Sequence, residues 1–154
     1  MPQVSVINYG VGNLRSVKRG LEKSDAEVLI THNSSDIVKS DAIVLPGVGA
    51  FAEAIKNISP LSNVLLQSVK GGKPLLGICL GLQLLFTRSY EGGVTEGLNL
   101  VEGDVVKLPD AVKLPHIGWN TIEIVEPNQL VEEVPSNSYM YFVHTYVPHP
   151  LEKE

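Results

Sequence analysis

The chain has 154 residues, of which 44% are hydrophobic and 19% charged, and its formal net charge is -5. This length supports one compact domain with its own core and excludes two full-sized domains. The negative charge and dispersed lysines and arginines argue against a nucleic-acid surface, one cysteine excludes an internal disulfide, and no apolar run reaches the roughly 18 residues of a membrane span.

The first half of the chain alternates apolar runs of strand length with segments of helical period. Strands are predicted over residues 4–8, 28–31 and 42–45 and in the run that carries Cys79, and helices over 14–21, 51–57 and 61–69. Residues 36–39 are predicted to form only a short turn, after the cap-type residues Ser34 and Ser35. The alternation is typical of β-α-β units and predicts a doubly wound α/β fold with a mostly parallel sheet.

The second half of the chain has a different pattern. A helix is predicted over residues 80–87 and a loop over 90–93, followed by strands over 98–108, 120–125 and 138–147. No long helix separates these strands, so we expect an antiparallel extension of the sheet. Residues 148–154 are expected to be a surface loop, which would leave residues 1–154 as a single domain without the element that closes such a sheet.

Cys79 lies in the segment G-I-C-L-G, residues 77–81, where an apolar strand is expected to turn directly into a helix. A strained turn of the form G-x-nucleophile-x-G needs glycines on both sides because the surrounding backbone crowds those positions. The alternative is an inert, buried cysteine, but glycine costs about 0.5–1 kcal/mol against alanine in a regular element and would bring a core strand no benefit. We therefore interpret Cys79 as a nucleophile whose thiolate is favoured by the first amides of the following helix.

The segment P-G-V-G-A-F, residues 46–51, follows a buried strand and exposes flexible backbone at the end of the sheet where α/β proteins bind ligands. Acyl transfer from a thiolate needs amide donors for the developing oxyanion, and we predict that Val48, Gly49 and Leu80 supply them. The alternative is an ordinary Pro-Gly turn. Gln83 lies one helical turn after Cys79, on the same face, and is either a polar substrate ligand or a half-buried helix residue.

No cofactor or metal site is predicted. The loop 8–15 resembles a dinucleotide-binding loop only weakly, because Arg15 replaces the third glycine and no acidic residue follows the second strand. His32 and His149 fall in expected loops, His116 and His144 accompany aromatic residues, and no Cys/His cluster has metal-ligand spacing. The first residues lack the pattern of a signal peptide, so we expect a cytoplasmic protein.

Five segments carry a family resemblance over essentially the whole chain: N-Y-G-V-G-N-L-R-S-V, P-G-V-G-A-F, G-I-C-L-G-L-Q, P-H-I-G-W-N and Y-F-V-H-T-Y. In this order and spacing they resemble the class I (triad) glutamine amidotransferases, which have a flavodoxin-like fold. The segment G-I-C-L-G-L-Q is typical of the whole superfamily, whereas the first segment, P-G-V-G-A-F and P-H-I-G-W-N most resemble the glutaminase subunit of imidazole glycerol phosphate synthase, an enzyme of histidine biosynthesis.

The resemblance implies that Cys79 attacks the carboxamide of glutamine and that Gly49, Gln83, Thr145 and Tyr146 hold the substrate. It also implies a heterodimer in which the hydrolase passes ammonia to a (β/α)8-barrel cyclase subunit, the lyase partner. In this family the backbone of residues 47–49 reorients when the partner binds its own substrate, which couples the two activities.

One departure affects the catalytic triad. Family members carry a Q-F-H-P-E motif that supplies the triad histidine and glutamate, and residues 1–154 do not contain it. We expect a truncated fold that is nearly inactive alone, since a general base contributes roughly 10²- to 10⁴-fold. His144 could stand in as the base, although its family position is not that of the base. The alternatives are a catalytically silent docking or regulatory subunit and another thiol hydrolase with the same elbow.

Overall fold

The computed structural model describes residues 1–111 and 113–151, and the chain divides into two compact units. Unit 1 consists of residues 1–106 together with the described residues from 148 onward, and unit 2 consists of residues 107–147. None of the helices in the described ranges is long and apolar enough to cross a bilayer.

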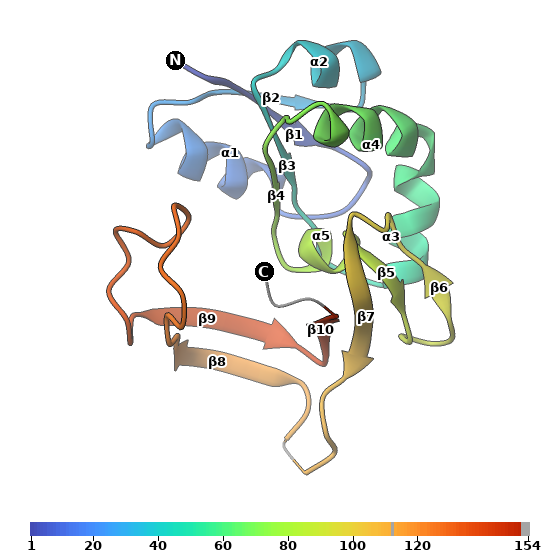
Figure 1. Cartoon of the computed structure of the whole chain (residues 1–154), viewed down its shortest axis with the longest axis vertical. Coiled ribbons are helices and arrows are strands. Elements are labelled where there is room, and N and C mark those ends of the chain that lie inside the picture. Colours follow the sequence, from blue (N-terminus) through green and yellow to red (C-terminus); the bar gives the residue numbers. More distant parts are fainter. Residues whose placement is uncertain (112, 152–154) are drawn as a thin grey trace. The chain divides into compact units, whose positions relative to one another are not determined.

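Unit 1 is built on a parallel sheet of four strands (Figure 1). The strands are β1 (Gln3–Ile7), β2 (Glu27–Thr31), β3 (Ala42–Leu45) and β4 (Leu75–Gly77). They are ordered β2-β1-β3-β4, and each neighbouring pair is parallel. This is the order of the flavodoxin-like doubly wound sheet, and it confirms the predicted α/β fold and its parallel β-α-β half.

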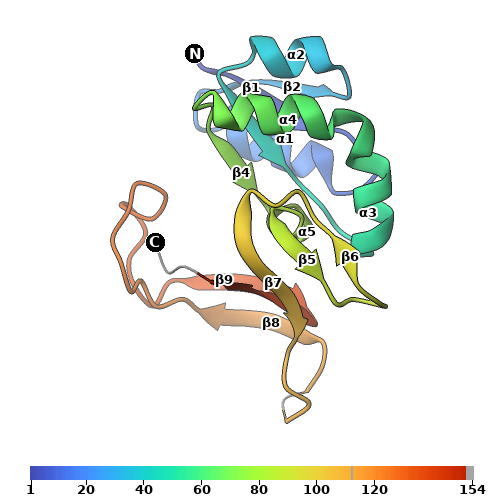
Figure 2. The same cartoon turned by 45° about the vertical axis from the view of Figure 1, so that its right-hand side comes forward.

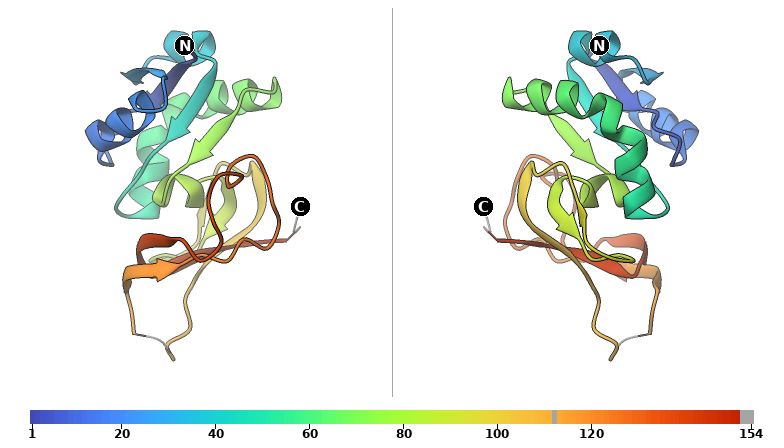
Figure 3. Two further views of the ribbon diagram at one scale, coloured as in Figure 1. Left: turned by 90° about the vertical axis from the view of Figure 1, so that its left-hand side faces the viewer. Right: turned by 90° about the vertical axis from the view of Figure 1, so that its right-hand side faces the viewer.

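Helices cover both faces of this sheet, with α1 on one face and α3 and α4 on the other (Figure 3). The helices of unit 1 that precede β4 are α1 (Leu14–Glu22), α2 (Ser34–Lys39), α3 (Phe51–Ile58), the 3₁₀ turn η1 (Ser59–Leu61) and α4 (Ser62–Lys70). Val4, Val6 and Val28 form the core beneath the apolar residues of α1. Ile7 and Leu45, which point to the opposite face, have no exposed surface.

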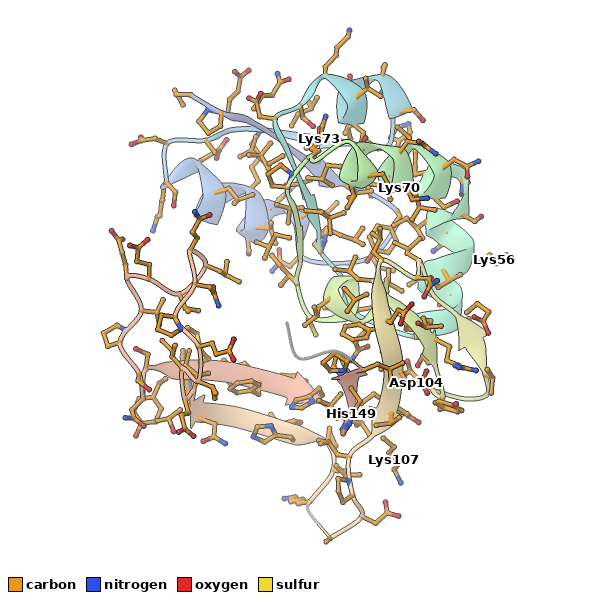
Figure 4. All side chains as sticks on the ribbon, viewed as in Figure 1. Lys56, Lys70, Lys73, Asp104, Lys107 and His149 are labelled. Carbon is orange, nitrogen blue, oxygen red and sulfur yellow. The ribbon has the colours of Figure 1, made fainter. Side chains whose placement is uncertain are left out.

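The prediction of a mere turn over residues 36–39 is wrong, because α2 is a helix that begins at Ser34. Its first turn is held by Asp36, whose carboxylate accepts a hydrogen bond from the Thr31 hydroxyl at 2.5 Å. This bond is the main reason that the pKa of Asp36 lies below its ordinary value. At the other end, the Lys73 ammonium donates to the carbonyls of Ile37 and Val38 (Figure 4), so a residue distant in sequence completes the helix.

The predicted helix over residues 80–87 begins where expected but is too long, because α5 (Leu80–Gln83) has only four residues. The amide of Leu98 donates to Leu84 at 2.8 Å and that of Leu100 donates to Leu85 at 2.8 Å. The helical pattern is lost at Leu85, whose amide donates to Leu82 at 3.1 Å, and Phe86 and Arg88 pair with a later segment as part of a strand. The chain then enters the strand β5 (Phe86–Ser89).

A second sheet has the order β10-β7-β5-β6. Besides β5, its strands are β6 (Thr95–Glu96), β7 (Val101–Lys107) and β10 (Tyr146–Pro150). Strands β7, β5 and β6 lie side by side in Figure 2. The pair β5–β6 is antiparallel but β5–β7 is parallel, so the extension is mixed rather than antiparallel. An ion pair between Arg88 on β5 and Asp104 on β7, 2.9 Å apart, joins the two central strands (Figure 4).

The prediction of a surface loop over residues 148–154 is wrong for residues 148–150, which belong to the strand β10. His149 lies there (Figure 4), and its carbonyl approaches Gly103 of β7 so closely that a Cβ at Gly103 would lie 2.2 Å away. The amide of Leu151 donates to Glu102 at 3.0 Å. Residues 152–154 lie outside the described residues.

Unit 2 contains an antiparallel pair, β8 (His116–Thr121) with β9 (Tyr139–His144). The predicted strand over 120–125 is therefore shifted, and the single strand over 138–147 is two strands divided at Thr145. Alternation alone does not determine which part of such a segment pairs, because the register depends on the partner strand. Trp119 faces Tyr141 across the pair, with ring centroids 5.6 Å apart.

Candidate active site

The loops that follow β1, β3 and β4 meet at the carboxyl edge of the parallel sheet. A Cβ on Gly12, in the first loop, would lie 3.4 Å from the amide nitrogen of Gly47 in the second. The amide of Ile78, in the third, donates to Leu45 at 3.0 Å. Three segments that carry the sequence motifs are thus neighbours at the place where open α/β sheets bind ligands.

Cys79 lies at the bend between β4 and α5, and its side chain is exposed. Its backbone has φ 53° and ψ -113°, a conformation that residues with a Cβ rarely adopt. Such strain costs of the order of 1–3 kcal/mol and persists only where the surroundings enforce it, often at functional sites. Cys79 is therefore not the buried core residue considered above.

The two glycines of the elbow are required by close backbone approach. A Cβ on Gly81 would lie 1.7 Å from the carbonyl oxygen of Leu45, and a Cβ on Gly77 would lie 2.6 Å from the Cα of Leu82. Any larger residue would push α5 away from the ends of β3 and β4. The G-x-C-x-G spacing therefore reflects the crossing of three backbone segments beneath the cysteine.

The Pro46–Ala50 loop presents backbone amides beside this elbow. Val48 and Gly49 are exposed, and Gly49 has φ +110°, which a side chain would disfavour. Among the described residues, the N–H groups of Val48, Gly49 and Leu80 form no hydrogen bond within the chain. The predicted oxyanion donors are thus unengaged backbone groups, two on the Pro46–Ala50 loop and one at the first residue of α5.

Gln83 is half-buried and lies one turn after Cys79, where its amide donates to the Cys79 carbonyl at 3.2 Å. This confirms that the two residues belong to the same helical turn. Because α5 ends at Gln83, the helix dipole that would stabilise a Cys79 thiolate is that of a single turn and is weaker than the dipole of a longer helix.

Glu91 lies next to the Pro46–Ala50 loop, a position that the sequence did not predict. Its carboxylate accepts a hydrogen bond from the amide of Phe51 at 3.0 Å and so caps α3, whose N-cap residue Ala50 has no side-chain oxygen. This places a negative charge directly after the Pro46–Ala50 loop. The sequence signal was weak, because a lone glutamate in the loop over 90–93 is equally typical of a solvated turn.

Tyr9 is a second residue that was missed. Its side chain is only 5% exposed, and its hydroxyl donates to the carbonyl of Pro46. Burial, and next the charge on Cys79, raise the pKa of Tyr9 above its ordinary value. The hydroxyl therefore remains a protonated donor beside the Pro46–Ala50 loop.

The remaining predicted ligands, Thr145 and Tyr146, lie in unit 2. The Thr145 carbonyl accepts from the amide of Leu108 at 2.9 Å. Both ring nitrogens of His144 are hydrogen-bonded within the same unit. Its Nε2 lies 3.0 Å from Nδ1 of His116, and its Nδ1 lies 3.1 Å from the Tyr146 carbonyl. With both ring nitrogens engaged, His144 is poorly placed to act as a general base. Within the described ranges no cluster of His, Cys, Asp and Glu could hold a metal ion.

The family model described as "Glutamine amidotransferase class-I" matches residues 5–154. The chain therefore belongs to the class I glutamine amidotransferases, which confirms the resemblance seen in its motifs. Among solved structures, one described as a glutamine amidotransferase has a TM-score of 0.75 at 18% identity, over 97% of this chain and 75% of that one. This likeness supports the fold.

Two curated relatives from different organisms carry the same subunit name. Imidazole glycerol phosphate synthase subunit HisH of Methanosarcina barkeri is 44% identical over 147 residues, which cover 95% of this chain and 73% of that protein. The subunit of the same name from Aquifex aeolicus is 46% identical over 144 residues, which cover 92% of this chain and 70% of that protein.

Proposed function

We propose that the protein is the glutaminase subunit of an imidazole glycerol phosphate synthase and releases ammonia from glutamine through a cysteinyl thioester. The observation that carries this proposal is Cys79, exposed on a strained elbow beside the Pro46–Ala50 loop, whose amides are unengaged. Relatives that bear this subunit's name at 44–46% identity support the choice of reaction.

In the proposed reaction the Cys79 thiolate attacks the carboxamide carbon of glutamine, which forms a C–S bond and moves the carbonyl electrons onto oxygen. The resulting oxyanion accepts hydrogen bonds from the amides of Val48, Gly49 and Leu80. When the intermediate collapses, the C–N bond breaks and the nitrogen takes a proton from a general acid to leave as ammonia. Water then attacks the thioester carbon, the C–S bond breaks, and glutamate leaves with the sulfur returned to the thiolate.

The proton carrier is proposed to be the histidine of the family's Q-F-H-P-E motif, oriented by its glutamate. Neither residue is among the 154 of this sequence. The measurements below use the protein in complex with its partner subunit.

Substrate glutamine also carries an α-ammonium and an α-carboxylate that need partners. Gly49, Gln83, Thr145 and Tyr146 are proposed to hold the substrate. We add Glu91, because its carboxylate is tied to the end of the Pro46–Ala50 loop and supplies a negative charge for the ammonium. The released ammonia is proposed to pass to a (β/α)8-barrel cyclase, and residues 47–49 to change conformation when that partner is occupied.

The proposal is tested with a glutamine analogue that carries a diazoketone or chloroketone in place of the carboxamide. Incubation of the full-length complex should attach one analogue to Cys79, as measured by mass spectrometry of the digested protein, and excess glutamine should protect the site. A folded complex that binds its partner but is never labelled would instead favour a silent docking subunit. Labelling that glutamine does not prevent would favour another thiol hydrolase.

Replacement of Glu91 by glutamine should raise the KM for glutamine by roughly tenfold, since a charge-assisted hydrogen bond to the substrate becomes neutral. The kcat at saturating glutamine should change by less than about threefold. Steady-state ammonia release measures both parameters. Glu96→Gln, an exposed glutamate on β6, is the matched control and should leave KM unchanged. An unchanged KM in Glu91→Gln would limit Glu91 to capping α3.

A further inference from the structure

The hydroxyl of Tyr9 has no role in the proposed reaction, although it is hydrogen-bonded to the Pro46–Ala50 loop. Tyr9 follows β1, a strand that lies between β2 and β3, and its side chain is buried beneath the Pro46–Ala50 loop. The one hydrogen bond that its hydroxyl donates goes to the carbonyl of Pro46, which is itself fully buried. No other side chain among the described residues bonds this carbonyl.

Gly47 is held between Tyr9 and the cysteine elbow. A Cβ on Gly47 would lie 2.6 Å from the Tyr9 hydroxyl oxygen, 2.9 Å from the Cβ of Leu80 and 3.0 Å from the amide of Gly81. Tyr9, Gly47 and the first residues of α5 are therefore in direct contact. A shift of the Tyr9 hydroxyl would move the peptide that precedes Val48 and Gly49.

We propose that Tyr9 is a positioning residue of the glutaminase: it fixes the Pro46–Gly47 peptide and thereby sets where the Val48 and Gly49 amides lie relative to Cys79. This inference rests on the proposed function, because it assigns those amides to the oxyanion. The raised pKa of Tyr9 agrees with it, since the hydroxyl stays protonated while the thiolate forms close by.

Loss of the Tyr9 hydroxyl should weaken binding of the transition state and leave binding of the substrate unchanged. Donors that are displaced from the oxyanion stabilise it less, while the ground-state carboxamide is bound through other groups. Tyr9→Phe removes only the hydroxyl and retains the buried ring. It should lower kcat for glutamine hydrolysis by roughly ten- to a hundredfold and change KM by less than about twofold.

The test compares Tyr9→Phe with Tyr90→Phe in the full-length complex. Tyr90 is exposed, and its hydroxyl contacts Asp104 at 3.4 Å, so the control should retain the wild-type kcat. All rates are normalised to the amount of folded, partner-bound complex recovered by gel filtration. A partly unfolded variant therefore still reports on the proposal.

Two alkylation rates separate positioning from a general structural effect. Iodoacetamide needs no oxyanion donors, so its rate with Cys79 should change by less than about twofold in Tyr9→Phe, whereas the glutamine chloroketone should react more slowly in proportion to kcat. Equal slowing of both reagents, or an unchanged kcat, would overturn the proposal for Tyr9. If the wild-type complex itself failed to hydrolyse glutamine, the proposed function would fail instead.

Discussion

Cys79→Ala should abolish glutamine-dependent turnover by the full-length protein with its partner, with a loss of at least roughly 10⁴-fold, since removal of a nucleophile eliminates the covalent route. Turnover supplied with ammonium salt should continue at the wild-type rate, because the partner's reaction needs ammonia but not the thioester. Both rates can be followed by formation of the partner's product. Cys79 is the only cysteine among residues 1–154, so no other thiol of this part of the chain can replace it.

Two results would contradict this expectation. Glutamine-driven turnover that survives in Cys79→Ala would show that the elbow is not the acyl-transfer site. Loss of the ammonia-dependent activity as well would show that the substitution had disrupted the complex, and not only the chemistry. The small change in side-chain volume at an exposed position makes the second result unexpected.

Gly81→Ala should destabilise the fold by more than about 3 kcal/mol, because the new methyl group would meet the backbone of β3 and cannot be relieved by a rotamer change. The distance from its Cβ to the carbonyl oxygen of Leu45 would be 1.7 Å. Urea denaturation followed by circular dichroism measures the loss. Glutamine hydrolysis should fall with it, since α5 and the Leu80 amide would move.

Gly20→Ala is the matched control for this substitution. Gly20 is exposed in α1, and no atom lies within 4 Å of its Cβ position, so alanine should stabilise the protein by about 0.5–1 kcal/mol through helix propensity. If Gly81→Ala and Gly20→Ala unfolded at the same urea concentration, the crossing of α5 over the end of β3 would be refuted.

The sequence predicted those features whose physical cause is local. The strands β1 to β4 and the helices α1, α3 and α4 follow from apolar runs and helical spacing, because burial against a sheet face needs only that periodicity. The elbow at Cys79 was equally predictable, since glycines two residues on either side report a crowded bend. The gathering of residues 46–50 and Cys79 followed from the rule that parallel strands end at one edge.

Tertiary structure decided the features that depend on a distant partner. α5 stops at Gln83 because the residues that follow pair with β6 and β7 as the strand β5. Glu91 caps α3 from another segment, and Tyr9 reaches the Pro46 carbonyl across the sheet edge. A hydrogen bond between residues about 40 positions apart leaves no periodic signal in either segment. Donor and acceptor therefore come together only in the folded chain, where the sequence alone could not have paired them.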